Sequence, residues 1–191
     1  MDSQRWLTAI PVYNEARHVA GVLAEVRRHS PDILVVDDGS SDATPRLLDA
    51  EPGILRVTHP ANRGYGAAVA SAFRFAVDHR YDVLVTMDCD GQHQPDRIPV
   101  LLEALSGCDV VSGSRYLRDF RQDTPAPTDR RFINATVTRE INDRYGLDLT
   151  DAFCGFKAYR VDALRRLNVT EHGWGMPLQL WVQAARLGWR V

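Results

Sequence analysis

The chain has 191 residues, 45% of them apolar and 25% charged, and its formal net charge is −2 at pH 7. This length allows one α/β domain with a core of its own, and the near-neutral charge excludes a general electrostatic attraction to nucleic acid. Three widely spaced cysteines argue against a disulfide framework or a zinc site and fit a reducing compartment. No apolar run approaches the ~20 residues that span a bilayer, and no signal segment follows Met1, so we expect a cytoplasmic protein.

The first part of the chain alternates between apolar runs and amphipathic segments. We expect strands at 6–12, 33–36, 55–59, 83–88 and 109–113, and helices at 19–26, after Asp42, from Gly66 through Val77 and at 96–105. The repeated strand–helix order predicts an α/β fold with a mostly parallel sheet flanked by helices. Ligands bind such sheets at the carboxyl ends of the strands.

The pattern changes after the fifth of these strands. The stretch Ser114–Asp129 holds arginines, aspartates and prolines without periodicity. A loop of this length is usually functional or mobile, although a solvated surface loop is equally compatible. We then expect a helix capped by Asp129, a short strand ending at Arg160 and a helix at 177–187. Residues 187–191 resemble a helix end, a turn and the start of a strand, so we expect a truncated sequence.

An acidic motif, Asp88-Cys89-Asp90-Gly91-Gln92, ends the fourth strand. Side chains two residues apart on a strand lie on the same side, so Asp88 and Asp90 meet if the extended geometry continues to the end of the motif. Two adjacent carboxylates are tolerated mainly around a cation. Oxygen ligands, to which Gln92 would add an amide, favour Mg²⁺ or Mn²⁺, and such ions usually retain substrate phosphates. The motif therefore indicates a metal that holds a diphosphate.

The motif has three other interpretations. A solvated acidic turn needs no ligand at all. An EF-hand calcium loop would require glycine at His93 and glutamate at Pro99, and both requirements fail. A phosphatase of the haloacid-dehalogenase type would use Asp88 as its nucleophile, but that nucleophile should follow the first strand, whereas three strands precede Asp88 here.

The loops after the other strands also carry polar or glycine-rich motifs. Each has an ordinary structural explanation by itself, such as a helix-capping turn for the paired aspartates. Because the carboxyl ends of parallel strands lie at one edge of a sheet, all of them are expected to meet there. The motifs are Pro11-x-Tyr13-Asn-Glu15, Asp37-Asp38 and Asn62-x-Gly64-x-Gly66.

Together these stretches resemble family 2 glycosyltransferases of the GT-A fold. The resemblance covers nearly the whole chain, in the right order, and extends to polyprenyl-phosphate (dolichyl-phosphate) mannosyl- and glucosyltransferases. The motifs that carry it are Ile10-Pro-Val-Tyr-Asn-Glu15, Val35-Val-Asp-Asp-Gly-Ser-Ser-Asp42, Asn62-Arg-Gly-Tyr-Gly-Ala67, Met87-Asp-Cys-Asp-Gly-Gln-His-Gln-Pro95, Val111-Ser-Gly-Ser-Arg-Tyr116 and Asp151-Ala-Phe-Cys-Gly-Phe-Lys157.

The resemblance implies roles for particular residues. The nucleotide-sugar would be contacted by Pro11, Tyr13, Glu15, Val36, Asp37, Asp38, Asp88, Cys89, Asp90 and Arg115. Among these, Val36 and Asp38 would hold the base. The metal, Mg²⁺ or Mn²⁺, would be bound by Asp88, Asp90 and Gln92, and the phosphates of donor or acceptor by Arg115 and Arg131. Tyr65 departs from the family, which commonly has a lysine at that place.

The implied activity is an inverting, metal-dependent transfer of a hexose from a UDP- or GDP-sugar. A glycan hydroxyl as acceptor would need a general base within hydrogen-bond reach. Asp151 is the best carboxylate for that role, although it could equally position the loop 114–131, and His93 is as compatible with the surface as with the site. A polyprenyl phosphate needs no base, because its oxygen is already anionic. We therefore expect a polyprenyl phosphate acceptor.

Two further expectations follow from this activity. A lipid acceptor implies peripheral association with the cytoplasmic face of a membrane. The stretch Ser114–Asp129 would then act as a lid over donor and acceptor. A domain that binds nucleotide and metal without turnover remains the alternative of another class.

Overall fold

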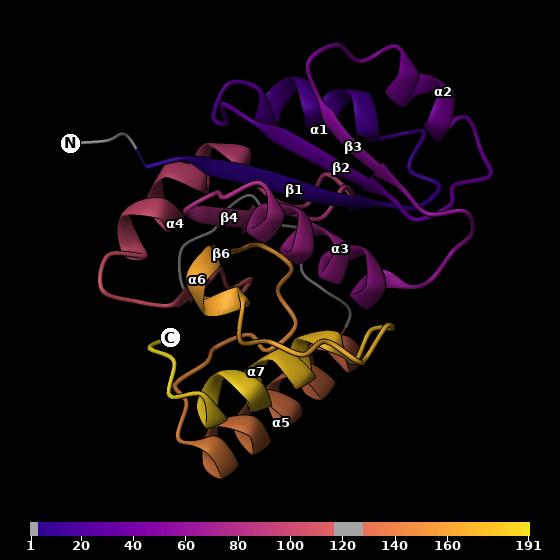
Figure 1. The fold of residues 1–191 in the computed structure, drawn as a ribbon. Helices are drawn as coiled ribbons and strands as arrows, with labels where there is room; N and C mark the ends of the chain where they lie inside the picture. The colour runs from indigo at the N-terminus through magenta and orange to yellow at the C-terminus, as the bar shows by residue number, and fades with distance from the viewer. Residues whose placement is uncertain (1–3, 117–127) are drawn as a thin grey trace.

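The computed structural model describes residues 4–116 and 128–191, which form a six-stranded sheet of order β3-β2-β1-β4-β6-β5 (Figure 1). Strands β1 to β4 are parallel, whereas β6 runs antiparallel to its neighbours β4 and β5. The predicted mostly parallel sheet is confirmed. The strands are β1 (Trp6–Val12), β2 (Ile33–Asp37), β3 (Leu55–Thr58), β4 (Val83–Thr86), β5 (Val110–Ser112) and β6 (Lys157–Arg160).

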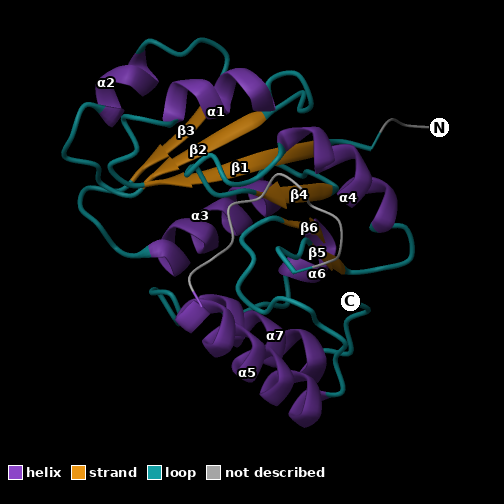
Figure 2. Ribbon diagram, turned by 180° about the vertical axis from the view of Figure 1, so that it is seen from behind, coloured by secondary structure: helices purple, strands orange, loops and turns teal. Residues whose placement is uncertain are grey.

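Helices cover both faces of this sheet (Figure 2). One face packs against α1, α2 and α4, and the other against α3, α6 and α7, with α5 lying beside α7. The helices are α1 (Val19–Val26), α2 (Thr44–Asp49), α3 (Tyr65–Asp78), α4 (Ile98–Ala104), α5 (Thr128–Tyr145), α6 (Val161–Leu164) and α7 (Met176–Arg186), and a 3₁₀ turn, η1 (Pro95–Arg97), precedes α4.

The central strands show why the sheet is covered on both sides. Every residue of β2 is buried. Because successive side chains alternate between faces, Leu34 and Val36 pack toward α3, whereas Ile33 and Val35 pack toward α1. A strand buried on both faces must be apolar throughout, which agrees with the prediction from its sequence.

The carboxyl ends of the parallel strands meet at one edge, as predicted. In the register of the sheet, Val12 of β1 lies beside Asp37 of β2. The loops after these two strands are joined by Asn14, whose Oδ1 accepts hydrogen bonds from the N–H groups of Ser41 (2.8 Å) and Asp42 (3.2 Å). In return, Asp42 accepts a hydrogen bond from the N–H of Ala16 at 3.2 Å. These contacts hold the edge together before any ligand binds.

Two expectations need comment. The helix expected to be capped by Asp129 is present as α5 and begins at Thr128. Most of the predicted loop 114–129 lies outside the described residues, so its role as a lid stays a prediction. In the part of the chain that the structure describes, no helix is both long enough and apolar enough to cross a membrane.

We predict opposite effects of alanine at two helical glycines. A Cβ at Gly66 would overlap the carbonyl oxygen of Glu171 and lie 2.8 Å from Cβ of Met176, whereas a Cβ at Gly21 would meet nothing within 4 Å. Overpacking should make Gly66→Ala less stable by about 1–3 kcal/mol. Gly21→Ala should gain about 0.5–1 kcal/mol from helix propensity. Urea unfolding measures both values, and an unchanged midpoint for Gly66→Ala would contradict the packing described.

Candidate active site

Asp88 occupies the centre of the carboxyl edge and is held by its neighbours. Its N–H donates a hydrogen bond to Nδ1 of His93 at 3.1 Å, and its Oδ2 lies 3.8 Å from Nε2 of the same ring. A Cβ at Gly155 would overlap both carboxylate oxygens, so the main chain of Gly155 lies directly against them. The hydroxyl of Thr86 fixes that main chain by donating a hydrogen bond to the carbonyl of Gly155 at 2.8 Å. The Asp88 carboxylate therefore has little freedom to move.

His93 is a supporting residue that the sequence did not single out. Its side chain is only 9% exposed and its ring stacks on Phe156 with centroids 5.3 Å apart. Because Nδ1 accepts a main-chain hydrogen bond, the ring proton of the neutral form lies on Nε2, facing Asp88. Burial lowers the pKa of His93 and outweighs the opposing charges of Asp88 and Asp90. The ring is thus neutral and directed at Asp88, not at solvent.

The rest of the acidic motif differs from the expected extended geometry. Strand β4 ends at Thr86, and the chain bends from Cys89 through Gly91, where φ is 74°. Asp90 is exposed, and its Oδ1 accepts a hydrogen bond from the N–H of Gln92 at 2.9 Å. Strand alternation therefore does not bring Asp88 and Asp90 together. Their relation is set by a turn, because the ladder of β4 stops before either residue.

The motif still fits a hard divalent cation that binds together with a substrate. Within residues 4–116 and 128–191 no group of three or more His, Cys, Asp or Glu side chains is arranged to hold a metal. Asp88, Asp90 and Gln92 offer two carboxylates and an amide, and Mg²⁺ commonly completes such a set with phosphate oxygens and water. Burial, helped by the charges of Glu15, Asp90 and Asp88, raises the pKa of Cys89 to about 12. Its thiol is therefore protonated at neutral pH, and a soft sulfur ligand also matches Mg²⁺ less well than oxygen does.

The paired aspartates after β2 are buried and bonded to protein groups. Asp38 accepts hydrogen bonds from Nδ1 of His59 (2.6 Å) and from the N–H groups of Arg63 (3.0 Å) and Gly64 (2.8 Å). Asp37 accepts one from the N–H of Ser40 (3.0 Å) and pairs with Arg56 (3.0 Å). Both carboxylates therefore shape the loops at the edge. Their contact with a nucleotide base stays a prediction.

Other predicted donor contacts differ in accessibility. Val36 has no exposed surface in the sheet, and its contact with the base stays a prediction. Pro11 is half-buried, whereas Tyr13 is 46% exposed at the same edge. Glu15 pairs with His18 at 2.8 Å. Tyr13 is thus the predicted contact that is best placed to meet a ligand from solvent.

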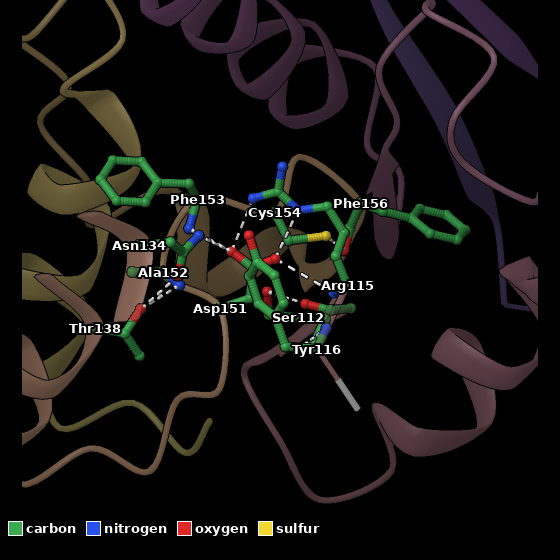
Figure 3. A network of polar contacts seen from close by, with 12 residues as sticks. Ser112, Arg115, Tyr116, Asn134, Thr138, Asp151, Ala152, Phe153, Cys154 and Phe156 are labelled. Carbon is green, nitrogen blue, oxygen red and sulfur yellow. Dashed lines mark hydrogen bonds and ion pairs between the residues drawn. The ribbon is translucent and has the colours of Figure 1, made fainter. Parts of the chain in front are cut away.

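Asp151 lies at the centre of a second polar network (Figure 3). Its side chain has no exposed surface, and its two oxygens accept hydrogen bonds from Nε (2.7 Å) and Nη2 (3.0 Å) of Arg115. One oxygen also accepts hydrogen bonds from Nδ2 of Asn134 (2.7 Å) and from the N–H of Phe153 (3.1 Å). Asn134 belongs to α5, so this carboxylate joins α5 to the segment after β5 and the segment before β6.

These surroundings make Asp151 an anchor rather than a base. Burial alone would raise its pKa, but the hydrogen bonds from Arg115 and Asn134 outweigh burial and lower the pKa. The same pairing raises the pKa of Arg115. With a further hydrogen bond from the N–H of Arg115 at 3.3 Å, this carboxylate accepts five hydrogen bonds. An ionised carboxylate so fully bonded is a poor proton acceptor, so these surroundings favour the suggested positioning role of Asp151, and its catalytic role stays a prediction.

The two predicted phosphate-binding arginines are placed by this anchor. Arg115 keeps 39% of its side chain exposed while bonded to Asp151. Arg131 is exposed on α5, three residues before Asn134 and therefore on the same side of the helix. The anchor thus brings a fixed guanidinium and the first turns of α5 to one region of the site.

Lys157, on β6, is a buried cation that the sequence did not single out. Its Nζ donates a hydrogen bond to the carbonyl of Cys154 and lies 5.4 Å from the centre of the Trp181 ring. Burial lowers its pKa, whereas the charges of Cys154, Asp88 and Asp151 act in the opposite direction. A buried ammonium costs free energy unless it is paired. The attraction of the Asp88 and Asp151 carboxylates offsets part of this cost.

Most of the chain matches a known protein family. Residues 8–167 match the sequence profile described as Glycosyl transferase family 2. The chain belongs to this family. It is 38% identical over 98% of its length to an undecaprenyl-phosphate mannosyltransferase of Micrococcus luteus, of which it covers 80%. It is 34% identical over 88% of its length to a polyprenol monophosphomannose synthase of Mycolicibacterium smegmatis, of which it covers 66%.

Solved structures confirm the GT-A fold of this glycosyltransferase. Glucosyl-3-phosphoglycerate synthase from Mycobacterium tuberculosis, in complex with UDP, superposes with a TM-score of 0.73 at 20% identity. The match covers 97% of this chain and 67% of that one. The same protein in complex with Mn²⁺, UDP and phosphoglyceric acid gives a TM-score of 0.72 at 21% identity. The predicted family, fold class and enzyme class are thereby confirmed.

We predict that Gly155→Ala inactivates the glycosyltransferase without unfolding it. The added Cβ overlaps the Asp88 carboxylate, which must move. Displacing a positioned group by about 1 Å typically costs about 100-fold in rate, and we expect a loss of this size in sugar transfer. Circular dichroism and the melting temperature of Gly155→Ala should stay close to those of the wild type. Gly21→Ala, whose added Cβ meets nothing within 4 Å, is the control that should keep full activity. Full activity of Gly155→Ala would contradict the close approach.

We predict that Asp151→Asn destabilises the protein at neutral pH and less in acid. Hydrogen bonds to charged groups contribute about 1.5–3 kcal/mol each, so the loss should reach at least this range at pH 7. Because the folded-state pKa of Asp151 is lowered, its contribution is present above the unfolded pKa of about 3.9 and is lost as pH falls through the folded pKa. Urea unfolding at pH 7 and pH 3 should show the difference from wild type shrinking.

Asp162→Asn is the matched control for this variant, because the Asp162 side chain is 96% exposed. Its stability should stay within about 0.5 kcal/mol of wild type. A pH-independent difference between Asp151→Asn and wild type would contradict the ionised anchor.

Proposed function

We propose that this glycosyltransferase transfers a hexose, with mannose as the first candidate, from a UDP- or GDP-linked donor to a polyprenyl phosphate. Two relatives named for mannose transfer to such lipids, at 38% and 34% identity, support the proposal. The chain spans 80% and 66% of the lengths of these two relatives, so the donor sugar and the acceptor are proposed from the matching part of the sequences alone.

The engagement of both suggested bases, Asp151 and His93, by protein groups is the observation that carries the choice of acceptor. A hydroxyl acceptor requires a group within hydrogen-bond reach that takes its proton. Asp151 is ionised but fully bonded, and both ring nitrogens of His93 face Asp88. A polyprenyl phosphate attacks through an oxygen that already carries negative charge near neutral pH. The described residues therefore suit a phosphate acceptor better than a hydroxyl.

The proposed reaction is a single displacement at the anomeric carbon of the donor sugar. The acceptor phosphate oxygen forms the new bond to this carbon. The bond from the carbon to the donor phosphate oxygen breaks, and its electron pair leaves with the nucleoside diphosphate. Attack in line with the leaving group inverts the configuration. Arg115 and Arg131 would bind phosphate oxygens through charge-assisted hydrogen bonds and so bring the two anionic substrates together.

Asp88, Asp90 and Gln92 would hold the Mg²⁺ or Mn²⁺. When bound, the ion would offset the negative charge of the departing diphosphate. Asp88 is fixed by His93 and Gly155, whereas Asp90 is exposed in a turn. We therefore infer that Asp88 is ready before the donor arrives and that Asp90 completes the site together with the donor. Because the acceptor is a membrane lipid, the enzyme would work at a membrane surface.

We predict that nucleoside diphosphates stabilise the protein only in the presence of a divalent cation. At a ligand concentration 100 times the Kd, binding adds about 2.7 kcal/mol to the free energy of unfolding. A thermal-shift series with UDP and GDP, each with Mg²⁺ or with EDTA, identifies the base. Asp90→Asn should abolish the shift, while Asp96→Asn, an exposed carboxylate outside the motif, should retain it. An equal shift in EDTA would overturn the metal assignment.

The acceptor is tested by transfer from radiolabelled GDP-mannose or UDP-glucose. A short-chain polyprenyl phosphate should be glycosylated, and the matched polyprenol, which has a hydroxyl instead, should not. Transfer to the polyprenol, or to a glycan hydroxyl, would overturn the choice of acceptor and leave the enzyme class intact.

A further inference from the structure

Two aromatic rings, Tyr65 and Trp174, stack at the edge of the site. Their centroids are 5.0 Å apart and their planes differ by 9°. Tyr65 begins α3, and Trp174 lies in the segment just before α7. Tyr65 packs against the core beneath it, whereas Trp174 is 78% exposed. The pair therefore presents one flat indole face to solvent, backed by a second ring.

The segment that carries Trp174 is held firmly on α3. The N–H of Ala67 donates a hydrogen bond to the carbonyl of His172 at 3.2 Å. A Cβ at Gly64 would overlap this carbonyl, and one at Gly66 would overlap the carbonyl of Glu171, so the two backbones are in direct contact. Figure 1 shows this segment reaching the N-terminal end of α3. Trp174 is thus exposed on a well-anchored backbone.

The stacked pair lies between two carboxylates of the site. Asp38 binds the N–H of Gly64, directly before Tyr65, at 2.8 Å. At the other side, burial together with the charge of Asp88 raises the pKa of Tyr65 well above its ordinary value, so Asp88 lies within electrostatic reach of Tyr65. The ring of Trp174 lies one stacking distance beyond Tyr65.

A large exposed aromatic face beside a polar site needs an explanation, since burying it would be favourable. Ligand sites combine aromatic surfaces with a few placed polar groups. A pyranose ring has this character, because its C–H bonds line its faces and its hydroxyl groups lie at the rim. A nucleotide base is a weaker candidate for Trp174, because the exposed Tyr13, directly after β1, offers the base another aromatic contact.

We propose that Trp174, supported by the stacked Tyr65, is the platform on which the sugar of the donor lies beside Asp88. Trp174 contacts a C–H face of the pyranose. Tyr65 is a positioning residue, because its ring stacks under Trp174 and fixes the position of the indole. The inference rests on the proposed function and adds the subsite that separates a nucleotide-sugar from a nucleoside diphosphate.

Binding of GDP-mannose and of UDP-glucose, compared with GDP and UDP, tests the platform by titration calorimetry with Mg²⁺. Trp174→Ala should weaken the nucleotide-sugar by roughly three- to tenfold, the range for an aromatic contact, and leave the nucleoside diphosphate unchanged. Trp174→Phe should restore most of the loss. Phe132→Ala removes an aromatic side chain that is 72% exposed on α5 and is the matched control.

Iodide quenching of tryptophan fluorescence gives a second readout without mutation. Trp181 and Trp189 are buried at 0% and 7% exposure, Trp6 is half-buried, and Trp174 is the most exposed of the four tryptophans at 78%. Trp174→Phe identifies the share of the quenched emission that comes from Trp174. Nucleotide-sugar with Mg²⁺ should protect this fraction, whereas nucleoside diphosphate with Mg²⁺ should not.

Three outcomes overturn the platform. Equal weakening of nucleotide-sugar and nucleoside diphosphate by Trp174→Ala would assign the ring to the nucleotide. Unchanged binding of both, with a raised KM for the lipid acceptor, would assign it to the acceptor. Third, if the wild-type protein binds nucleoside diphosphates and no sugar adds affinity, the platform is wrong and the proposed function stands. Failure of the wild-type protein to bind any nucleotide would overturn the proposed function together with the platform.

Discussion

The ion pair between Asp151 and Arg115 is the interaction on which the arrangement of the site depends. It joins the segment after β5 to the segment before β6, and Asn134 adds α5 to the same carboxylate. From Asp151 the chain runs directly to Gly155, whose backbone fixes Asp88. Because removing one member of a buried charged group leaves the others unpaired, this geometry can only be kept or lost as a unit. The site therefore owes its precision to a group that touches no reacting atom.

The same network divides the charges of the site into two classes. Asp37, Asp38 and Asp151 are satisfied inside the protein, by Arg56, main-chain N–H groups and Arg115. Asp90 remains exposed, and Asp88 keeps a partly exposed carboxylate. Lys157 is buried within electrostatic reach of Asp88, and burial lowers its pKa. The negative charge that is left for a cation thus lies on the short motif after β4, which is the physical basis for a metal that binds with its substrate.

The N-terminal end of α3 contributes differently, through close packing. Gly64 and Gly66 leave room for the carbonyl groups of His172 and Glu171, so a segment more than 100 residues later in the chain lies directly on the helix. That contact places Trp174 on Tyr65. Tyr65 stands where the family commonly has a lysine. In this chain the position carries an aromatic ring that stacks on Trp174 instead of a charged side chain.

The sequence by itself determined the strands, the helices and the edge at which the polar motifs gather, because periodicity and turn residues are local properties and parallel strands share one carboxyl edge. The family followed from six motifs in order. The role of Asp151, the burial of His93 and the contact between Gly155 and Asp88 were decided only by tertiary structure. They depend on partners distant in sequence, and burial sets the protonation of each group. Likewise, the turn that follows β4 overrides the alternation expected for Asp88 and Asp90, because the pairing of β4 with β1 and β6 ends at Thr86.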